Sequence, residues 1–333
     1  EAVELTLAHR PDVALLDIRM PRLDGLSAAV EIIRAAPAVA VAVLTTFGED
    51  AYLTRALDDG VRGFLLKSGN PRELIAGVHA VAGGGAYLSP RMAARVIGEY
   101  RAYAEKRIYH AIAKTAKFVD AVKKGDVKRA KALYAPSRVG WESVEPLVEV
   151  FPEIDARVDS READLGQGEE WTGWHRLEKA LWRAPETLGR EAVYGDTLLA
   201  DLSRLRAMLP RAEITVASMA TGAKELLDEV ATSKVTGEEE VFSHTDLWDF
   251  KGNVDGAFEV YRLLRPMVFR RDPRLSATLD TEFADMRALL AEHAKGDGFA
   301  AYTDLSKKQI KELSDGLNAL AEPLSDLAAV IAG

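Results

Sequence analysis

Residues 171–182 read Trp-Thr-Gly-Trp-His-Arg-Leu-Glu-Lys-Ala-Leu-Trp, and the interpretation of most of the chain starts from them. In a helix, His175 and Glu178 lie three residues apart on one face, beside Trp174 and Leu181. An imidazole and a carboxylate in apolar surroundings need compensation, which either a bound cation or a direct hydrogen bond between them supplies. From these residues alone both interpretations stay open.

The composition narrows the class of protein. A chain of 333 residues with 48% hydrophobic content is long enough for two domains. A net charge of -9 argues against a nucleic-acid partner, and no apolar run approaches the ~20 residues of a membrane span. Because cysteine is absent, any metal must be held by nitrogen and oxygen ligands. The chain begins at Glu1 without a signal peptide, so we expect a fragment.

Short apolar runs alternate with helical patterns in the first hundred residues. We expect strands at residues 13–17, 39–44 and 63–66, and helices at residues 1–9, 26–36, 50–59 and 72–82. This alternation predicts an α/β fold with a doubly wound parallel sheet. The glycines at 83–85 follow a helix rather than a strand, so we expect a turn there and not a phosphate loop.

Three polar side chains, Asp17, Thr45 and Lys67, follow the expected strands. An acid, a hydroxyl and an amine at the carboxyl ends of parallel strands suit phosphoryl chemistry. With their neighbours they resemble a response regulator receiver domain, which has a flavodoxin-like fold; the neighbouring motifs are Pro11-Asp12-Val13, Met20-Pro21 and Asp24-Gly25. By this resemblance Asp17 is the phospho-acceptor, Thr45 the switch hydroxyl and Lys67 the phosphate-contacting lysine.

The sequence departs from the receiver pattern in two places. The strand whose acidic pair holds magnesium is missing before Glu1, together with the first helix and the second strand. Mg²⁺ would be a cofactor only if that strand were present, and without it the phosphoryl charge has no metal counterpart. The helix-turn-helix expected after Leu88-Ser89-Pro90 is also absent. We therefore expect residues 1–99 to form a truncated, inactive receiver domain.

From Ala102 onward the apolar periodicity is helical almost throughout. Glycine and proline mark the expected turns at Gly125-Asp126, Pro136, Pro152, Gly166 to Gly168, Pro185, Pro210, Gly237, Pro273 and Gly296 to Gly298. Residues 100–333 are therefore expected to form an all-α antiparallel bundle.

The segment from Gly173 to Trp182 resembles the Gly-x-His-x-x-Glu motif of the imelysin-like family, in particular the helical domain of EfeO-type proteins from bacterial iron uptake systems. Further motifs agree with that family in the same order: Gly125-Asp126, Trp141-Glu142, Glu145-Pro146, Asp155 with Asp159 and Arg161, Leu226-Leu227-Asp228-Glu229, Thr236-Gly237-Glu238-Glu239, the run from Ser243 to Phe250, and Ala321-Glu322-Pro323-Leu324. The resemblance covers residues 101–333. It implies iron or another divalent cation as the ligand, with zinc and copper possible.

Acids elsewhere in the chain are the candidate partners of His175 and Glu178. The resemblance places Glu142 near the His-x-x-Glu helix, with Glu145 as its substitute. Without the resemblance, a salt bridge from Arg138 to Glu142 one turn later is preferred.

Second-tier candidates lie on both sides of this helix. Asp159, with Asp155 and Arg161, is placed to orient the ligands. The large apolar residues within 242–250 indicate a partly buried segment, which makes Glu239, His244, Asp246 and Asp249 further candidates, with helix capping by Thr245 and Asp246 as the alternative. The other histidines have no acidic neighbours in the pattern and are expected to be ordinary: His9, His79, His110 and His293.

We expect the helical domain to be the metal-binding component of a bacterial iron uptake system and not an enzyme. A peptidase is one alternative, because imelysin-like proteins have been grouped with peptidases. The second histidine of His-Glu-x-x-His is missing, however, and Lys179 stands where the inverted motif needs histidine. A two-component signalling protein phosphorylated on Asp17 is the other alternative.

The EfeO resemblance implies an iron permease and a haem-peroxidase-like protein as partners, and an extracytoplasmic location in the periplasm or at the cell surface. A receiver domain implies the cytoplasm, where kinases find ATP. An accidental or engineered join of two unrelated pieces near Tyr100-Arg101 is therefore a further hypothesis. We expect no counterpart in this sequence of the cupredoxin domain often found in EfeO proteins.

Overall fold

The computed structural model describes residues 1–45, 60–67, 70–83, 87–88, 90–148, 150–232 and 234–332. These residues form two compact units. The first contains Glu1–Ile97, Arg262–Thr278 and the segment from Leu327, and the second contains Gly98–Tyr261 and Leu279–Asp326. Because two C-terminal segments are grouped with the first unit, the domain boundary expected between residues 99 and 100 stays a prediction.

A parallel sheet forms the centre of the N-terminal part. Its strands are adjacent in chain order: β1 (Val13–Asp17), β2 (Ala40–Thr45), β3 (Gly63–Leu66) and β4 (Tyr87–Leu88). The first three confirm the expected strands within a residue or so at their ends. The fourth was not predicted, since two residues are too few to give a recognisable pattern.

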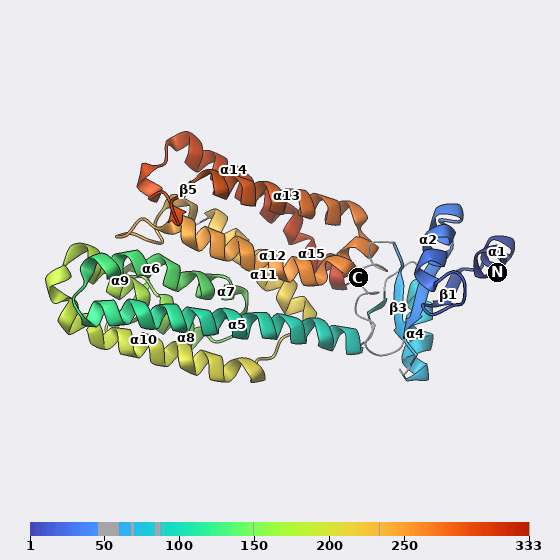
Figure 1. Cartoon of the computed structure of the whole chain (residues 1–333), viewed down its shortest axis with the longest axis horizontal. Coiled ribbons are helices and arrows are strands. Elements are labelled where there is room, and N and C mark those ends of the chain that lie inside the picture. Colours follow the sequence, from blue (N-terminus) through green and yellow to red (C-terminus); the bar gives the residue numbers. More distant parts are fainter. Residues whose placement is uncertain are drawn as a thin grey trace. The chain divides into compact units, whose positions relative to one another are not determined.

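Helices cover both faces of this sheet, as predicted for a doubly wound fold (Figure 1). Val41 and Val43 pack with α1 (Ala2–His9) and α2 (Gly25–Ala35), whereas Ala40 and Ala42 of the same strand pack with α4 (Pro71–Ala82). Successive residues of a strand point to opposite faces, so this alternation buries both. The helix expected at residues 50–59 lies outside the described residues, as do Gly84 and Gly85 of the expected turn.

The rest of the described chain is helical and confirms the predicted all-α architecture (Figure 1). The helices are α5 (Pro90–Lys123), α6 (Val127–Glu142), α7 (Glu145–Val148), α8 (Pro152–Asp159), α9 (Gly173–Arg183), α10 (Leu188–Met208), α11 (Val216–Thr232), α12 (Asp246–Arg271), α13 (Pro273–Glu292), α14 (Lys307–Ser325) and α15 (Leu327–Ala332). Strands β5 (Ala294–Lys295) and β6 (Gly298–Phe299) form a small antiparallel pair. Throughout the described ranges, no helix combines the length and the apolar character needed to cross a bilayer.

The turn expected at Pro136 was wrong, because this proline lies inside α6. A proline within a helix removes one backbone hydrogen bond and usually kinks or ends the helix. Here the residues that follow, among them Arg138 and Trp141, are fully buried. We infer that the packing of this half of α6 outweighs the lost hydrogen bond.

A glycine brings the central helix α9 close to α8. Gly173 has a φ of +85°, and a Cβ atom there would lie 2.2 Å from the carbonyl oxygen of Val158. Only glycine combines this backbone conformation with so close an approach. One residue later, the ring of Trp174 packs edge-on against Trp141 of α6 with ring centroids 5.8 Å apart. The next residue, His175, therefore points into the interior between α9, α8 and α6.

Candidate metal centre

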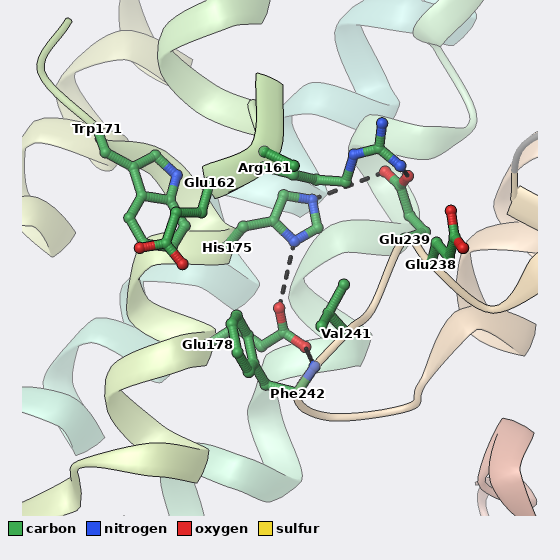
Figure 2. Close-up of a pocket in the computed structure, with 10 residues that line it drawn as sticks. Arg161, Glu162, Trp171, His175, Glu178, Glu238, Glu239, Val241 and Phe242 are labelled. Carbon is green, nitrogen blue, oxygen red and sulfur yellow. Dashed lines mark hydrogen bonds and ion pairs between the residues drawn. The ribbon is translucent and has the colours of Figure 1, made fainter. Parts of the chain in front are cut away.

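His175 and Glu178 lie on the buried face of α9, with 2% and 0% of their surface exposed. The Nδ1 atom of His175 is 3.3 Å from Oε2 of Glu178 (Figure 2). The direct contact that the sequence left as an alternative is thus present. It also fixes the orientation of the imidazole ring, whose other nitrogen points away from Glu178.

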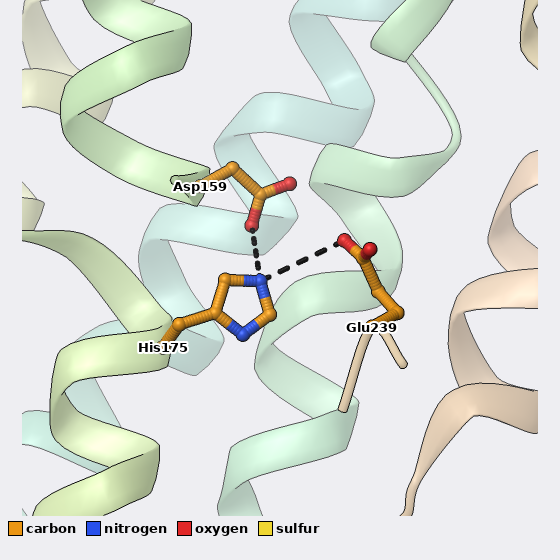
Figure 3. A group of neighbouring side chains, drawn as sticks. All are labelled: Asp159, His175 and Glu239. Atoms are coloured by element: carbon orange, nitrogen blue, oxygen red, sulfur yellow. Dashed lines mark ion pairs between the residues drawn. The ribbon is translucent and has the colours of Figure 1, made fainter. Parts of the chain in front are cut away.

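The second nitrogen of His175 faces two more carboxylates. Its Nε2 atom lies 3.4 Å from Oδ1 of Asp159 and 3.7 Å from Oε1 of Glu239 (Figure 3). Neither contact is a hydrogen bond, and Nε2 is buried without a hydrogen-bond partner in the described chain. Burial and the nearby Arg138 lower the pKa of His175, but attraction to the three carboxylates outweighs them and raises it well above its usual value.

Side chains in this region form three overlapping groups whose donor atoms lie within 4.8 Å of one another. Among the described residues these groups are Asp159 with His175 and Glu239, His175 with Glu178 and Glu240, and Glu142 with Glu145 and Asp159. The structure therefore brings His175 together with Asp159 and Glu239, two residues that the sequence ranked second.

Arg138, fully buried in α6, is the charge around which these acids are arranged. Its guanidinium lies 2.6 Å from Glu142 and 2.7 Å from Glu240, and it also contacts Asp159 and Asp249. The salt bridge between Arg138 and Glu142 that the sequence offered as an alternative is present. Among the described residues Glu142 is grouped with Glu145 and Asp159 and not with His175, and its expected role as a ligand beside His175 stays a prediction.

Glu145, the expected substitute for Glu142, faces another cation. Its Oε1 atom is 3.0 Å from Nζ of Lys234, which is 1% exposed and also lies 3.2 Å from Oε2 of Glu142. Burial raises the pKa of Glu145 well above its usual value, although Lys234 acts in the opposite direction. Glu145 is thus tied to Lys234 and is not grouped with His175.

The segment 237–245 carries the acids that approach α9 from the other side. Oε1 of Glu178 accepts hydrogen bonds from the backbone N–H groups of Phe242 at 2.9 Å and Ser243 at 2.6 Å. Asp246 accepts one from the N–H of Glu240 at 3.2 Å. Asp246 therefore holds the segment in place and, like the other candidates His244 and Asp249, belongs to none of the three groups found in the described chain.

Removing the Glu178 carboxylate is expected to loosen this segment. In Glu178→Ala the N–H groups of Phe242 and Ser243 lose a charged acceptor, and bonds to charged groups contribute about 1.5–3 kcal/mol each. Amide hydrogen exchange at Phe242 and Ser243 should therefore accelerate by at least roughly tenfold. The matched variant Glu178→Gln keeps an oxygen acceptor and should retain most of the protection. Equal exchange in the alanine variant and the wild type would contradict this role.

Two cavities open onto the group formed by Asp159, His175 and Glu239. One of about 410 Å³ is lined by His175, Glu178 and Glu239, with Trp171 and Phe242 in its wall (Figure 2). The other, of about 270 Å³, is strongly acidic; its lining includes Glu145, Asp155, Asp159, Arg161, Asp164, Glu229 and Glu239. Burial, with the nearby charges of Asp159 and Glu229, raises the pKa of Asp155 to about 7. Cations can thus approach the group from solvent.

The three polar residues of the sheet are placed as the strand pattern predicts. Nζ of Lys67 lies 2.5 Å from Oδ2 of Asp17, and this contact lowers the pKa of Asp17. Thr45 is buried at the end of β2, where its carbonyl accepts the N–H of Lys67 at 2.8 Å. No group of possible metal ligands includes Asp17 within the part of the chain that the structure describes. Phosphorylation of Asp17 stays a prediction.

Two residues of the centre had no role in the sequence analysis. Glu240, the last of three successive glutamates, is fully buried and accepts hydrogen bonds from Ser243 and Tyr134. Lys234 follows the end of α11 and carries no local pattern that marks it as buried. The large apolar residues that follow Glu240 in the sequence could have indicated that it is buried. No sequence pattern indicates the burial of Lys234.

Comparison with known proteins agrees with this architecture. Residues 96–327 match the sequence model of the Imelysin family (Peptidase M75), and residues 1–79 match that of the response regulator receiver domain. A solved structure from Parabacteroides distasonis ATCC 8503, described as an iron-regulated protein A precursor, superposes with a TM-score of 0.60. It shares 15% sequence identity and covers 74% of this chain and 97% of its own, so it shows similarity of fold alone.

Curated relatives are more similar in sequence. The Efem/EfeO family lipoprotein of Staphylococcus haemolyticus is 40% identical over 238 residues, which cover 70% of this chain and 82% of that protein. The iron uptake system component EfeM of Pseudomonas syringae is 41% identical over 235 residues, covering 69% and 82%. The iron uptake system component EfeO of Escherichia coli O157:H7 is 39% identical over 238 residues, covering 71% of this chain and only 63% of that protein. The chain therefore belongs to the imelysin family.

Proposed function

We propose that the helical part of this chain is the metal-binding component of a bacterial iron uptake system. Its cargo ion binds to Nε2 of His175 together with the carboxylates of Asp159 and Glu239. The names of the relatives support the iron uptake role, and the donor types support the cargo, because imidazole and carboxylate ligands suit ferrous or ferric iron. The same donors also accept zinc and copper, so the assignment of iron rests on the relatives.

One observation carries the site assignment: the Nε2 atom of His175 is buried without a hydrogen-bond partner in the described chain and lies between two carboxylates. A buried ring nitrogen without a partner is uncommon and calls for an explanation. A cation between Asp159 and Glu239 would give Nε2 the partner that it lacks, while Asp159 keeps its bonds from Arg138 and Trp141. In this arrangement Nδ1 of His175 donates to Glu178, as second-layer carboxylates do for metal-bound histidines.

The opposite nitrogen is a poorer position for the ion. Nδ1 of His175 already has Glu178 as its partner, whereas Nε2 has none among the described residues. Glu178 accepts two backbone N–H groups, and Glu240 accepts from Ser243 Oγ at 2.7 Å besides its ion pair with Arg138. We therefore assign Glu178 an orienting role and leave Glu142 and Glu145 outside the coordination sphere.

The remaining parts of the proposal follow the relatives and the resemblance. We propose an extracytoplasmic location for the helical part, an iron permease and a haem-peroxidase-like protein as partners, and no enzymatic activity. We also propose that residues 1–99 are a receiver domain without phosphotransfer activity, because the sequence departs from the receiver pattern as described above.

Calorimetric titration of the full chain with Fe²⁺ in the absence of oxygen tests this proposal. We expect one tight equivalent per chain and the release of about one proton at pH 7, because the raised pKa keeps metal-free His175 protonated there and the metal needs the neutral ring. Affinity should rise with pH up to that pKa. In the metal-free protein, the raised pKa stabilises the fold fully below about pH 6.5, and this contribution is lost as the pH rises through the folded-state pKa.

Titrations in two buffers with different ionisation enthalpies measure how many protons are released when the metal binds. If the binding enthalpies observed in the two buffers differ by about the difference between the ionisation enthalpies of those buffers, about one proton is released, which supports His175 as the ligand. Absence of a tight equivalent would refute the metal-binding function. An enthalpy that is the same in both buffers would refute the part assigned to His175.

A further inference from the structure

The two carboxylates that face Nε2 of His175 each turn one oxygen toward it and the other away (Figure 3). Oδ1 of Asp159 and Oε1 of Glu239 are the inner oxygens, 3.4 and 3.7 Å from Nε2. The outer oxygen of Asp159, Oδ2, accepts a hydrogen bond from the indole N–H of Trp141 at 2.8 Å. The outer oxygen of Glu239, Oε2, lies 3.5 Å from the guanidinium of Arg161. Each carboxylate therefore has one oxygen directed at the place of the ion and one engaged by another donor.

Trp141 is the more firmly placed of these two donors. It is fully buried in α6 and its ring packs against Trp174, whereas 29% of the side-chain surface of Arg161 is exposed. An indole has one N–H and no acceptor, so the single polar atom of this side chain is used on Asp159. If Asp159 turned to offer both oxygens to an ion, that buried N–H would lose its partner, which costs free energy. Trp141 therefore restricts Asp159 to one ligand oxygen.

The number of oxygens that a carboxylate offers affects which ions a site accepts. Ca²⁺ takes about six to eight oxygen ligands and often binds both oxygens of one carboxylate. Transition-metal ions accept imidazole nitrogen, and zinc is usually satisfied by about four ligands. The group formed by Asp159, His175 and Glu239 supplies one ring nitrogen and two inner oxygens. This donor set suits a transition-metal ion and is poor for Ca²⁺.

We propose that Trp141 is a positioning residue that sets the metal specificity of this site. It does not touch the ion. By holding the outer oxygen of Asp159 it keeps this ligand in the one-oxygen mode, which favours iron or zinc over Ca²⁺. The inference rests on the function proposed above, because it concerns which ion that site accepts.

The affinities of the full chain for Zn²⁺ and for Ca²⁺, measured by calorimetric titration, test the inference. Trp141→Phe keeps an aromatic ring in the core but removes the N–H, so Asp159 can turn and offer both oxygens. The affinity for Zn²⁺ should fall by about tenfold or more, as is usual when the hydrogen-bond partner of a metal ligand is removed. The affinity for Ca²⁺ should rise. A loss of packing alone would weaken both ions together and leave the ratio of the two affinities unchanged.

Trp174→Phe is the matched control. Trp174 is also fully buried, but its N–H donates to the neutral hydroxyl of Ser137 at 3.1 Å and not to a carboxylate. The ratio of the two affinities should therefore stay as in the wild type. Adding Asp159→Asn to Trp141→Phe should abolish the gain in affinity for Ca²⁺, because a side-chain amide has only one oxygen.

The outcomes separate the inference from the proposed function. A wild type that binds no Zn²⁺ would refute the proposed function and the inference with it. If the wild type binds Zn²⁺ and Trp141→Phe has the same ratio of affinities, the inference alone is overturned, as it is by a calcium gain that survives Asp159→Asn.

If circular dichroism shows that Trp141→Phe loses its helices, the wild type with isotope-labelled tryptophan decides. The indole N–H of Trp141, assigned by its magnetic resonance contacts with the ring of Trp174, should stay protected from solvent exchange when Zn²⁺ binds. Rapid exchange of this N–H in the loaded protein would overturn the inference, because Asp159 would then have released it.

Discussion

Replacing His175 by alanine is expected to lower the affinity of the full chain for Fe²⁺ by about a hundredfold or more. Structural zinc sites with four ligands bind with about 10–16 kcal/mol, so one ligand corresponds to roughly 3 kcal/mol. His175 supplies the single nitrogen donor of its group, and the remaining carboxylates of Asp159 and Glu239 are partly neutralised by Arg138. Titration of the variant beside the wild type at pH 7 measures the loss.

His293 provides a matched control for this substitution. It is also a buried histidine, with 6% of its surface exposed and an Nε2 atom that lacks a hydrogen-bond partner in the described chain. It belongs to none of the acidic groups found there. His293→Ala should therefore leave the affinity for Fe²⁺ unchanged. Similar affinities for the wild type and His175→Ala, or similar losses in both variants, would rule out His175 as the ligand.

Replacing Arg138 by methionine is expected to destabilise the metal-free protein by about 3–5 kcal/mol, the usual cost of removing one partner from a buried ion pair. Methionine keeps much of the side-chain volume but leaves Glu142, Glu240 and Asp159 without their shared counter-charge. Domains are stable by only about 5–15 kcal/mol, so this loss is a large part of the total. Urea denaturation at pH 7 measures it.

A lysine at position 138 distinguishes charge from geometry. Lysine keeps the positive charge but lacks the planar fork with which arginine reaches several carboxylates at once. We expect stability to fall in the order wild type, Arg138→Lys, Arg138→Met. Should the methionine variant not fold, the lysine variant still reports the role of the guanidinium. A methionine variant within about 1 kcal/mol of the wild type would contradict the role given to Arg138.

The architecture was largely predictable because it depends on local patterns. Strands and helices that are buried leave apolar patterns in the sequence. Such patterns are the apolar runs at 13–17 and 39–44 and the helical periodicity after Ala102. The exception at Pro136 shows where such patterns fail: the local preference of proline was overruled by the burial of Arg138 and Trp141, which are distant contacts that a sequence window does not contain.

The candidate site was predictable only in part, for the same reason. The three-residue spacing of His175 and Glu178 placed both on one buried face. The packing of α8 and the segment 237–245 against α9 decides which acid faces each ring nitrogen of His175. No periodic pattern in the sequence predicts this packing. Metal binding by Glu142 stays a prediction; its second cationic neighbour, Lys234, lies in a short 3-10 helix that no sequence pattern marks as buried.

The carboxylate of Glu239 borders both cavities of the centre, and the two are lined by largely different residues. An ion held there can be approached by a competing chelator from one side while it is still bound from the other. Exchange by direct hand-over then needs no unfolding of the helices, and the residence time of the ion would shorten as the concentration of the acceptor rises. For the metal-binding function proposed above, which requires both uptake and release of the ion, two-sided access of this kind would be an advantage.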